Sequence, residues 1–160
     1  YLMKMYELFI EKNLKEAIRE KIRIIHLGRK DRISKKLLQK IQNSENKTKD
    51  FKKYNLNIAL DYGGRDEIIR AVEKIKNQKS KIKNLSEDNF NQFLDTASQP
   101  YPDPDLIIRP SGEQRTSGLM IWQAAYAEYV FLDKHFPELK DEDIELAVNE
   151  YSKRQRRFGK

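Results

Sequence analysis

Apolar residues recur along this chain with two different periods, one typical of helices and the other typical of strands. In residues 1–21 they return at helical spacing with Glu and Lys between them, which predicts an amphipathic helix. Residues 22–27 are mostly aliphatic and end before a glycine, which predicts a strand. Residues 33–51 begin with an apolar stripe at helical spacing, so we expect a second helix there.

The central part of the chain repeats this alternation. A second strand is predicted at residues 56–60 and ends before Gly63-Gly64. Apolar residues at helical spacing over residues 68–75 predict the next helix. Ser86 precedes two acidic residues, as a helix N-cap often does, and predicts a further short helix.

The last third of the chain opens with a proline-rich connection. Residues 99–104 contain three prolines, which exclude a helix or a central strand. A short aliphatic strand is expected at 106–108. The pattern then predicts a helix around 121–127, a strand at 129–132 and a last helix that begins at Asp141.

Four short strands separated mainly by helices are typical of an α/β fold, with a mainly parallel β-sheet flanked by helices. The 160 residues fit one domain, and we expect a single domain over residues 1–160. The chain opens directly on a helix, and four strands make a small sheet for this architecture. We therefore expect the N-terminal part of the fold to be absent.

The chain is basic, with 32 Lys and Arg residues against 25 Asp and Glu residues and a formal net charge of +7. Such a charge suits nucleic acid, anionic lipid or phosphorylated small molecules as partners. Much of the lysine excess lies in mixed stretches that are typical of solvated helix faces, so the charge alone chooses no partner. The aromatic residues sit mostly at core spacing, and we expect no nucleic-acid partner.

Several classes of chemistry are excluded by composition. The chain has no cysteine, which excludes disulfides, thiol nucleophiles and cysteine metal sites and fits a cytoplasmic location. His26 and His135 lie far apart in the sequence, so a zinc site built on histidine is not expected. No stretch approaches the roughly 18 consecutive apolar residues of a membrane span.

The best candidate site is the polar segment that follows the third predicted strand. Arg109 ends that strand, so the sheet anchors its guanidinium, and Arg115, Thr116 and Ser117 follow in the same segment. Arginine forks and hydroxyl donors are the groups that bind a diphosphate. The alternative is an ordinary salt-bridged loop, in which one of the two arginines pairs with Glu113.

Glu128 is a second candidate, because it follows a nearly apolar stretch and directly precedes a strand. A carboxylate in such surroundings needs a compensating partner. One interpretation is a Mg²⁺ ion held by this carboxylate and a substrate diphosphate. The other is a buried Arg–Glu pair, and the residues alone leave both open.

Gly63-Gly64-Arg65-Asp66 matches neither of the common glycine-rich phosphate-binding patterns. We therefore interpret it as a glycine turn between a strand and a helix that is capped by Asp66.

Four motifs resemble the cis-prenyltransferase family and occur in the same order as they do there. They cover residues 57–68, 105–115, 122–128 and 156–159. The resemblance extends over essentially the whole chain. It implies the cis-prenyltransferase fold and a Mg²⁺-dependent enzyme that condenses isopentenyl diphosphate, unit by unit, onto an allylic diphosphate such as farnesyl diphosphate. The expected product is a long Z-polyprenyl diphosphate of the undecaprenyl type, a lipid carrier for the cell wall.

The resemblance also implies roles for individual residues. Arg109, Arg115 and Ser117 match the positions that hold isopentenyl diphosphate, and Thr116 lies inside the same loop. Glu128 matches the family's magnesium-associated glutamate.

At the end of the chain, Arg157 and Gly159 match an Arg-x-Gly element that reaches the partner's active site in a homodimer. A peripheral contact with the membrane, made through the lipid product, is a further expectation.

The chain departs from the family at single positions and by one absence. Pro110, Gly118 and Asp61 stand where other residues are usual, and the first two adjoin the diphosphate loop. The family's Asp-Gly-Asn-x-Arg section, which carries the magnesium aspartate and cradles the allylic diphosphate, does not occur. We therefore expect no catalytic residue in this chain and an incomplete enzyme. The alternative is a non-catalytic or half-site subunit of a hetero-oligomeric cis-prenyltransferase.

Overall fold

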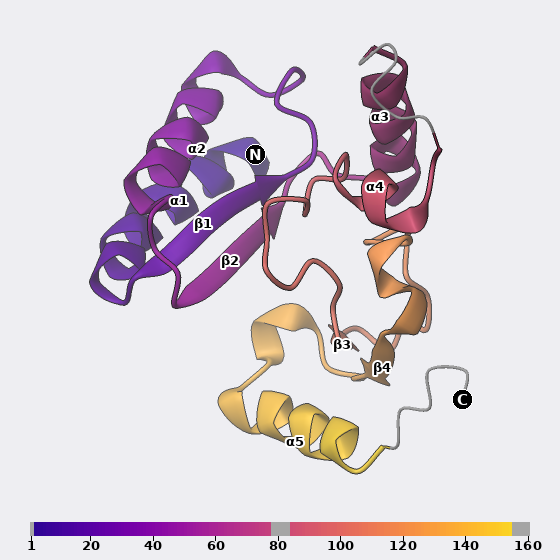
Figure 1. The fold of residues 1–160 in the computed structure, drawn as a ribbon. Coiled ribbons are helices and arrows are strands. Elements are labelled where there is room, and N and C mark those ends of the chain that lie inside the picture. Colours follow the sequence, from indigo (N-terminus) through magenta and orange to yellow (C-terminus); the bar gives the residue numbers. More distant parts are fainter. Residues whose placement is uncertain (1, 78–83, 155–160) are drawn as a thin grey trace. The chain divides into compact units, whose positions relative to one another are not determined.

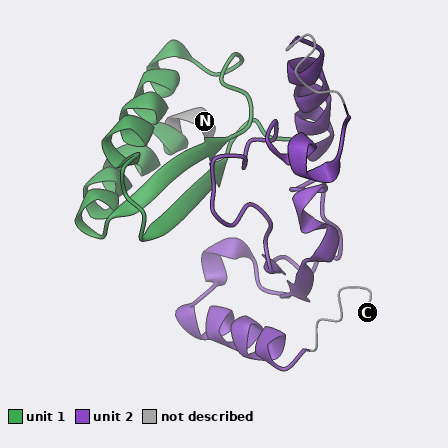
Figure 2. Cartoon of the chain, in the orientation of Figure 1, with its two compact units in different colours: residues 1–63 green, residues 64–160 purple. Residues whose placement is uncertain are grey.

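The computed structural model describes residues 2–77 and 84–154. The chain divides into two compact units, residues 1–63 and residues 64–160, called here the N-terminal and the C-terminal unit (Figure 2). Each unit contains a parallel pair of strands, with the first two helices of the chain packed against the first pair and the last helix against the second, so the predicted α/β class with parallel strands is confirmed. The single domain over residues 1–160 stays a prediction.

The N-terminal unit alternates helix and strand in the order α1 (Leu2–Arg19), β1 (Ile22–Leu27), α2 (Lys35–Thr48) and β2 (Tyr54–Ala59). The two strands run parallel, from Ile22 opposite Tyr54 to Leu27 opposite Ala59. The helices lie beside each other against this pair (Figure 1). Their apolar stripes form a core of Ile10, Leu37 and Ile41 together with Leu60, which directly follows β2.

A buried hydroxyl joins α2 to β1. Thr48 is fully buried; its Oγ1 accepts a hydrogen bond from the Ile24 N–H at 3.0 Å and donates to the Ser44 carbonyl at 2.8 Å. We expect Thr48→Val to lower the free energy of unfolding by about 1–3 kcal/mol, because it leaves the buried Ile24 N–H without an acceptor. Urea denaturation measures this loss. Thr48→Ser, which keeps the hydroxyl, should lose clearly less, and equal losses would contradict the role of the hydrogen bond.

The C-terminal unit begins with α3 (Gly64–Asn77) and α4 (Glu87–Asn91). Ser86 caps α4, as predicted, by accepting from the Asn89 N–H. Apolar residues of the two helices and of the turns after α4 form the core of this unit. The members of this cluster are Ala71, Phe90, Phe93 and Leu94, with Ile68, Ile75 and Trp122 packed against it.

The rest of this unit is built on the second parallel strand pair. Its elements are β3 (Leu106–Arg109), the 3-10 turn η1 (Gln123–Tyr126), β4 (Glu128–Phe131), the 3-10 turn η2 (Phe136–Glu138) and α5 (Asp141–Ser152). Strands β3 and β4 pair from Leu106 opposite Glu128 to Arg109 opposite Phe131. The helix expected around 121–127 is only the four-residue η1, because Ala127 is already extended where the chain enters β4.

A buried polar network holds the start of α3. Glu67 is 1% exposed; its Oε1 accepts from the Asp95 N–H at 2.8 Å, and both carboxylate oxygens accept from Gln123 Nε2 at 3.2 Å. One turn later, Arg70 forms two 2.7 Å hydrogen bonds with the carboxylate of Asp95. These contacts fasten α3 to the segment after α4 and to η1.

Among the helices of the described residues, none combines the length and the apolar character needed to cross a membrane.

Candidate functional site

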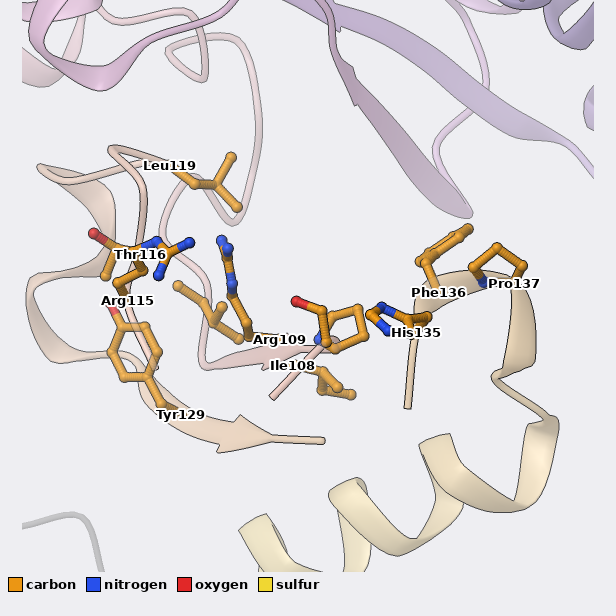
Figure 3. A pocket seen from close by; sticks show the side chains of 12 residues that line it. Ile108, Arg109, Arg115, Thr116, Leu119, Tyr129, His135, Phe136 and Pro137 are labelled. Carbon is orange, nitrogen blue, oxygen red and sulfur yellow. The ribbon is translucent and has the colours of Figure 1, made fainter. Parts of the chain in front are cut away.

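A cavity of about 510 Å³ opens at the carboxyl end of β3, within the C-terminal unit. Its walls come from β3, the polar segment after it, Tyr129 of β4, His135 and the first two residues of η2. The lining residues are Ile107, Ile108, Arg109, Pro110, Ser111, Arg115, Thr116, Leu119, Tyr129, His135, Phe136 and Pro137. Figure 3 shows the Arg109 and Arg115 guanidinium groups on one side of the cavity, with His135, Phe136 and Pro137 on the other. The cavity is therefore cationic on one side and partly apolar on the other.

Arg109 is the last residue of β3, and its side chain has no counter-ion within the described part of the chain. Its Nε is buried and has no hydrogen-bond partner there. The backbone around it is fixed: the Arg109 carbonyl accepts from the Leu132 N–H at 2.8 Å, and the Ser111 N–H donates to the Lys134 carbonyl at 2.8 Å. A permanently charged guanidinium held in this way is a site for an anion.

Arg115 lines the same cavity but already has a partner, because its Nη1 pairs with the carboxylate of Glu113. The two side chains are 63% and 41% exposed, so the pair contributes little to stability and a bound anion could compete with it. The salt-bridged-loop interpretation thus describes Arg115 in this structure and does not describe Arg109.

Some hydroxyl-bearing residues of the loop line the cavity and one does not. Thr116 lines the cavity, whereas Ser117 is exposed outside the lining, with a left-handed backbone φ of +49°. Ser111 lines the cavity and was not singled out from the sequence, and neither were His135 and Phe136. The signal for the last two is topological, since the segment after β4 must leave the same edge of a parallel pair as the segment after β3.

Glu128 lies at the other end of the strand pair. It is the first residue of β4 and pairs with Leu106 of β3. Leu106 and Arg109 are three residues apart, which is about 10 Å along the strand. Its Oε2 accepts a hydrogen bond from Arg154 Nη1 at 2.8 Å, and Arg154 also pairs with Glu150. These hydrogen bonds, the one to Glu128 first, raise the pKa of the Arg154 guanidinium. An Arg–Glu pair is therefore present at Glu128, but it is not the buried pair that the sequence left open, because both side chains are 31% exposed.

Two further candidates cannot be placed. Arg157 and Gly159 lie outside the described residues. Within residues 2–77 and 84–154, no group of three or more His, Cys, Asp or Glu side chains could hold a metal ion.

The far wall of the cavity is tied to α5 by an ion pair. Asp143 accepts from Lys134 Nζ at 2.6 Å and from the Lys140 N–H at 3.0 Å, and these bonds hold the pKa of the Asp143 carboxyl below its usual 3.8. A depressed carboxyl pKa stabilises the fold above the usual pKa, and this stabilisation is lost as the pH falls through the lower folded value.

We therefore expect Asp143→Asn to lower the thermal midpoint at pH 7, where the wild-type carboxylate is ionised. The difference from wild type should shrink as the pH falls from 3.8 through the lower folded pKa, because the wild-type carboxyl becomes protonated, and therefore neutral like asparagine, over that range. Thermal unfolding of both proteins between pH 7 and pH 2.5 measures this. A difference that stays constant over the whole range would contradict the role of the ion pair.

Comparison with known proteins places the whole chain among isoprenoid-synthesising sequences. A family profile described as undecaprenyl diphosphate synthase matches residues 1–159. An isoprenyl transferase of Thermotoga maritima is 44% identical over 99% of the chain, which covers 68% of that protein. The geranylgeranyl-diphosphate-specific tritrans,polycis-undecaprenyl-diphosphate synthase of Pyrobaculum aerophilum is 36% identical, with the same two coverages.

A solved structure agrees with these matches. The crystal structure of lavandulyl diphosphate synthase from Lavandula x intermedia, in complex with dimethylallyl diphosphate, superposes with a TM-score of 0.93 at 33% identity. The comparison covers 99% of this chain and 70% of that one. The chain thus spans about two thirds of the length of these proteins.

Proposed function

The chain belongs to the undecaprenyl diphosphate synthase family of isoprenyl transferases, and on this basis we propose that it carries the isopentenyl diphosphate site of a cis-prenyl transferase. The reaction is the sequential condensation of isopentenyl diphosphate onto an allylic diphosphate such as farnesyl diphosphate. Its product is a long Z-polyprenyl diphosphate, a lipid carrier of the undecaprenyl type.

The uncompensated Arg109 in the cavity at the end of β3 is the observation that supports this proposal most strongly. A diphosphate carries two to three negative charges, and arginine forks bind such groups through paired, charge-assisted hydrogen bonds. Arg115 and Thr116 line the same cavity and add a second fork and a hydroxyl donor. Leu119 and Phe136 give the cavity apolar surface for the five-carbon chain of the substrate.

In this proposal the residues of the cavity bind and orient the nucleophile. The double bond of isopentenyl diphosphate attacks C1 of the allylic substrate, a carbon–carbon bond forms, and the bond from C1 to the allylic diphosphate oxygen breaks. A proton is then lost to regenerate a double bond. Arg109, fixed at the end of a strand, would hold the isopentenyl diphosphate group still while this happens, so that the reacting atoms stay in line. The groups that assist departure of the allylic diphosphate are not assigned to this chain.

Mg²⁺ is implied by the resemblance, and Glu128 is the residue that would provide a carboxylate ligand. When bound, the ion would neutralise diphosphate charge. In this structure the Glu128 carboxylate pairs with Arg154 and does not line the cavity. The described residues therefore do not fit a magnesium site at the cavity, and no step above depends on one.

We also propose a homodimer in which Arg157 and Gly159 reach the partner's site, as the resemblance implies.

Isothermal titration of this chain with isopentenyl diphosphate tests the proposal. We expect saturable binding that is strong relative to isopentenol, which has the same carbon chain and no charge. The full-length gene product, given labelled isopentenyl diphosphate, farnesyl diphosphate and Mg²⁺, should form long polyprenyl diphosphates. Equal, negligible heats for isopentenyl diphosphate and isopentenol would contradict the proposed site.

A further inference from the structure

Gly64, the first residue of α3, is hydrogen-bonded to the loop that begins at Arg109 and carries Arg115. The Gly64 N–H donates a 2.9 Å hydrogen bond to the carbonyl of Gly118. Gly118 directly follows Arg115, Thr116 and Ser117, so this bond holds the far end of the loop that begins at Arg109. The near end is held separately, by the backbone hydrogen bonds at the end of β3.

Gly64 is a residue at which any side chain would disturb this contact. A Cβ added there would lie 2.6 Å from the Gly118 carbonyl oxygen and 2.8 Å from Cγ1 of Ile121, both well inside van der Waals contact. Gly118 differs, because no described atom lies within 4 Å of a Cβ added to it. Its φ of +78° requires only a residue that tolerates the left-handed region, and asparagine does so.

If a Cβ were added at Gly64, the loop would move and the helix would stay. Helix α3 is fastened by buried Glu67 to the Asp95 N–H and to Gln123, and by Arg70 to the Asp95 carboxylate. The loop is exposed at Arg115, Thr116 and Ser117. A clash between a fastened helix and an exposed loop is relieved by displacement of the loop.

From this geometry we propose that Gly64 is a positioning residue for diphosphate binding. Its lack of a side chain lets the loop approach α3 and so sets the distance of Arg115 and Thr116 from Arg109, which β3 fixes independently. A diphosphate that bridges two guanidinium groups depends on that distance. This inference rests on the proposed function. The Gly63-Gly64 motif does not match a phosphate-binding loop, and the inference gives its second glycine a role in positioning such a loop.

Two glycine substitutions at opposite ends of one hydrogen bond test the inference. We expect Gly64→Ala to weaken isopentenyl diphosphate binding by about 10- to 100-fold in isothermal titration, since a displaced loop loses one or two charge-assisted hydrogen bonds to the ligand, each worth about a factor of 10. The matched control, Gly118→Asn, should keep the wild-type affinity within about twofold because its Cβ meets nothing. Equal affinities of wild type and Gly64→Ala would overturn the inference, as would an equal loss in Gly118→Asn.

A second measurement does not depend on whether Gly64→Ala folds. If the Gly64–Gly118 contact and the ligand stabilise each other, then the ligand must slow hydrogen exchange at the Gly64 amide in the wild-type chain. We expect exchange to slow at least about threefold at saturating isopentenyl diphosphate; an unchanged rate would overturn the inference while leaving the proposed function intact. If the wild-type chain binds no isopentenyl diphosphate, the proposed function fails, and the inference fails with it.

Discussion

Replacing Arg109 by alanine is expected to weaken isopentenyl diphosphate binding about 100-fold without lowering the thermal midpoint. The loss follows from two charge-assisted hydrogen bonds worth about 1.5 kcal/mol each, together close to a factor of 100 in affinity. The fold should tolerate the change because Arg109 has no ion pair with any residue the structure describes, and its buried Nε has no hydrogen-bond partner there. Isothermal titration and thermal unfolding measure the two quantities.

Two variants make this expectation specific. Arg109→Lys keeps the charge but not the fork, and should recover only part of the affinity. Arg19→Ala removes an exposed arginine whose ion pairs lie within α1 and just after it, and should bind like the wild type. Early unfolding of Arg109→Ala would show that the guanidinium has a structural role instead. Normal binding of isopentenyl diphosphate by this variant would show that the guanidinium does not bind the ligand.

The same substitution at Arg115 should have a smaller effect. Arg115 is 63% exposed and already paired with Glu113, so binding must break that pair before the guanidinium contacts the ligand. The sequence placed Arg109 at the end of a strand but left open which of the two arginines pairs with Glu113. The difference between them depends on the backbone: Arg109 lies in a strand, whereas Arg115 lies in a loop whose direction local sequence does not determine.

The predictable part of the fold is the part set by apolar periodicity. The strands at β1, β2, β3 and β4 were each located to within two residues, because their apolar runs are short, rich in β-branched or aromatic residues and bounded by glycine, proline or polar residues. The helix around 121–127 came out as a four-residue turn. Its composition suits a helix. However, the Trp122 indole N–H donates a hydrogen bond to the side chain of Asn91, and the chain must be extended at Ala127 to enter β4. The spacing of apolar residues within one segment does not predict such tertiary contacts.

The candidate site was predictable in its residue types and less so in its geometry. Arg109, Arg115 and Thr116 do line one cavity, as their position after an apolar strand suggested. Ser117 is not among the lining residues, and its own backbone is left-handed, with a φ of +49° that the sequence does not predict for a serine. The roles of Glu67 and Gln123 were missed altogether, since a glutamate in a charged helix gives no sequence signal that it will be buried.

Replacing Glu67 by alanine is expected to lower the free energy of unfolding by about 3–5 kcal/mol, the sum of two unsatisfied buried donors and a cavity and the largest stability effect we anticipate. The substitution removes the acceptor for the Asp95 N–H and for Gln123 Nε2 and leaves a cavity at a position that is 1% exposed. Gln123 is buried as well, and its Oε1 has no partner among the described residues, so the amide cannot easily find new ones. Urea denaturation of the two proteins measures the loss.

Two matched variants separate burial from charge. Glu73→Ala changes an exposed glutamate of the same helix and should alter stability by no more than about 0.5 kcal/mol. Glu67→Gln keeps the shape and one acceptor oxygen, so it should retain the bond to the Asp95 N–H and lose less than Glu67→Ala. Because this network fastens α3, Glu67→Gln should also leave Gly64 in place and isopentenyl diphosphate affinity nearly unchanged. If Glu67→Ala proved as harmless as Glu73→Ala, α3 would not be the fixed element, and the loop would have no firm support against which to be positioned.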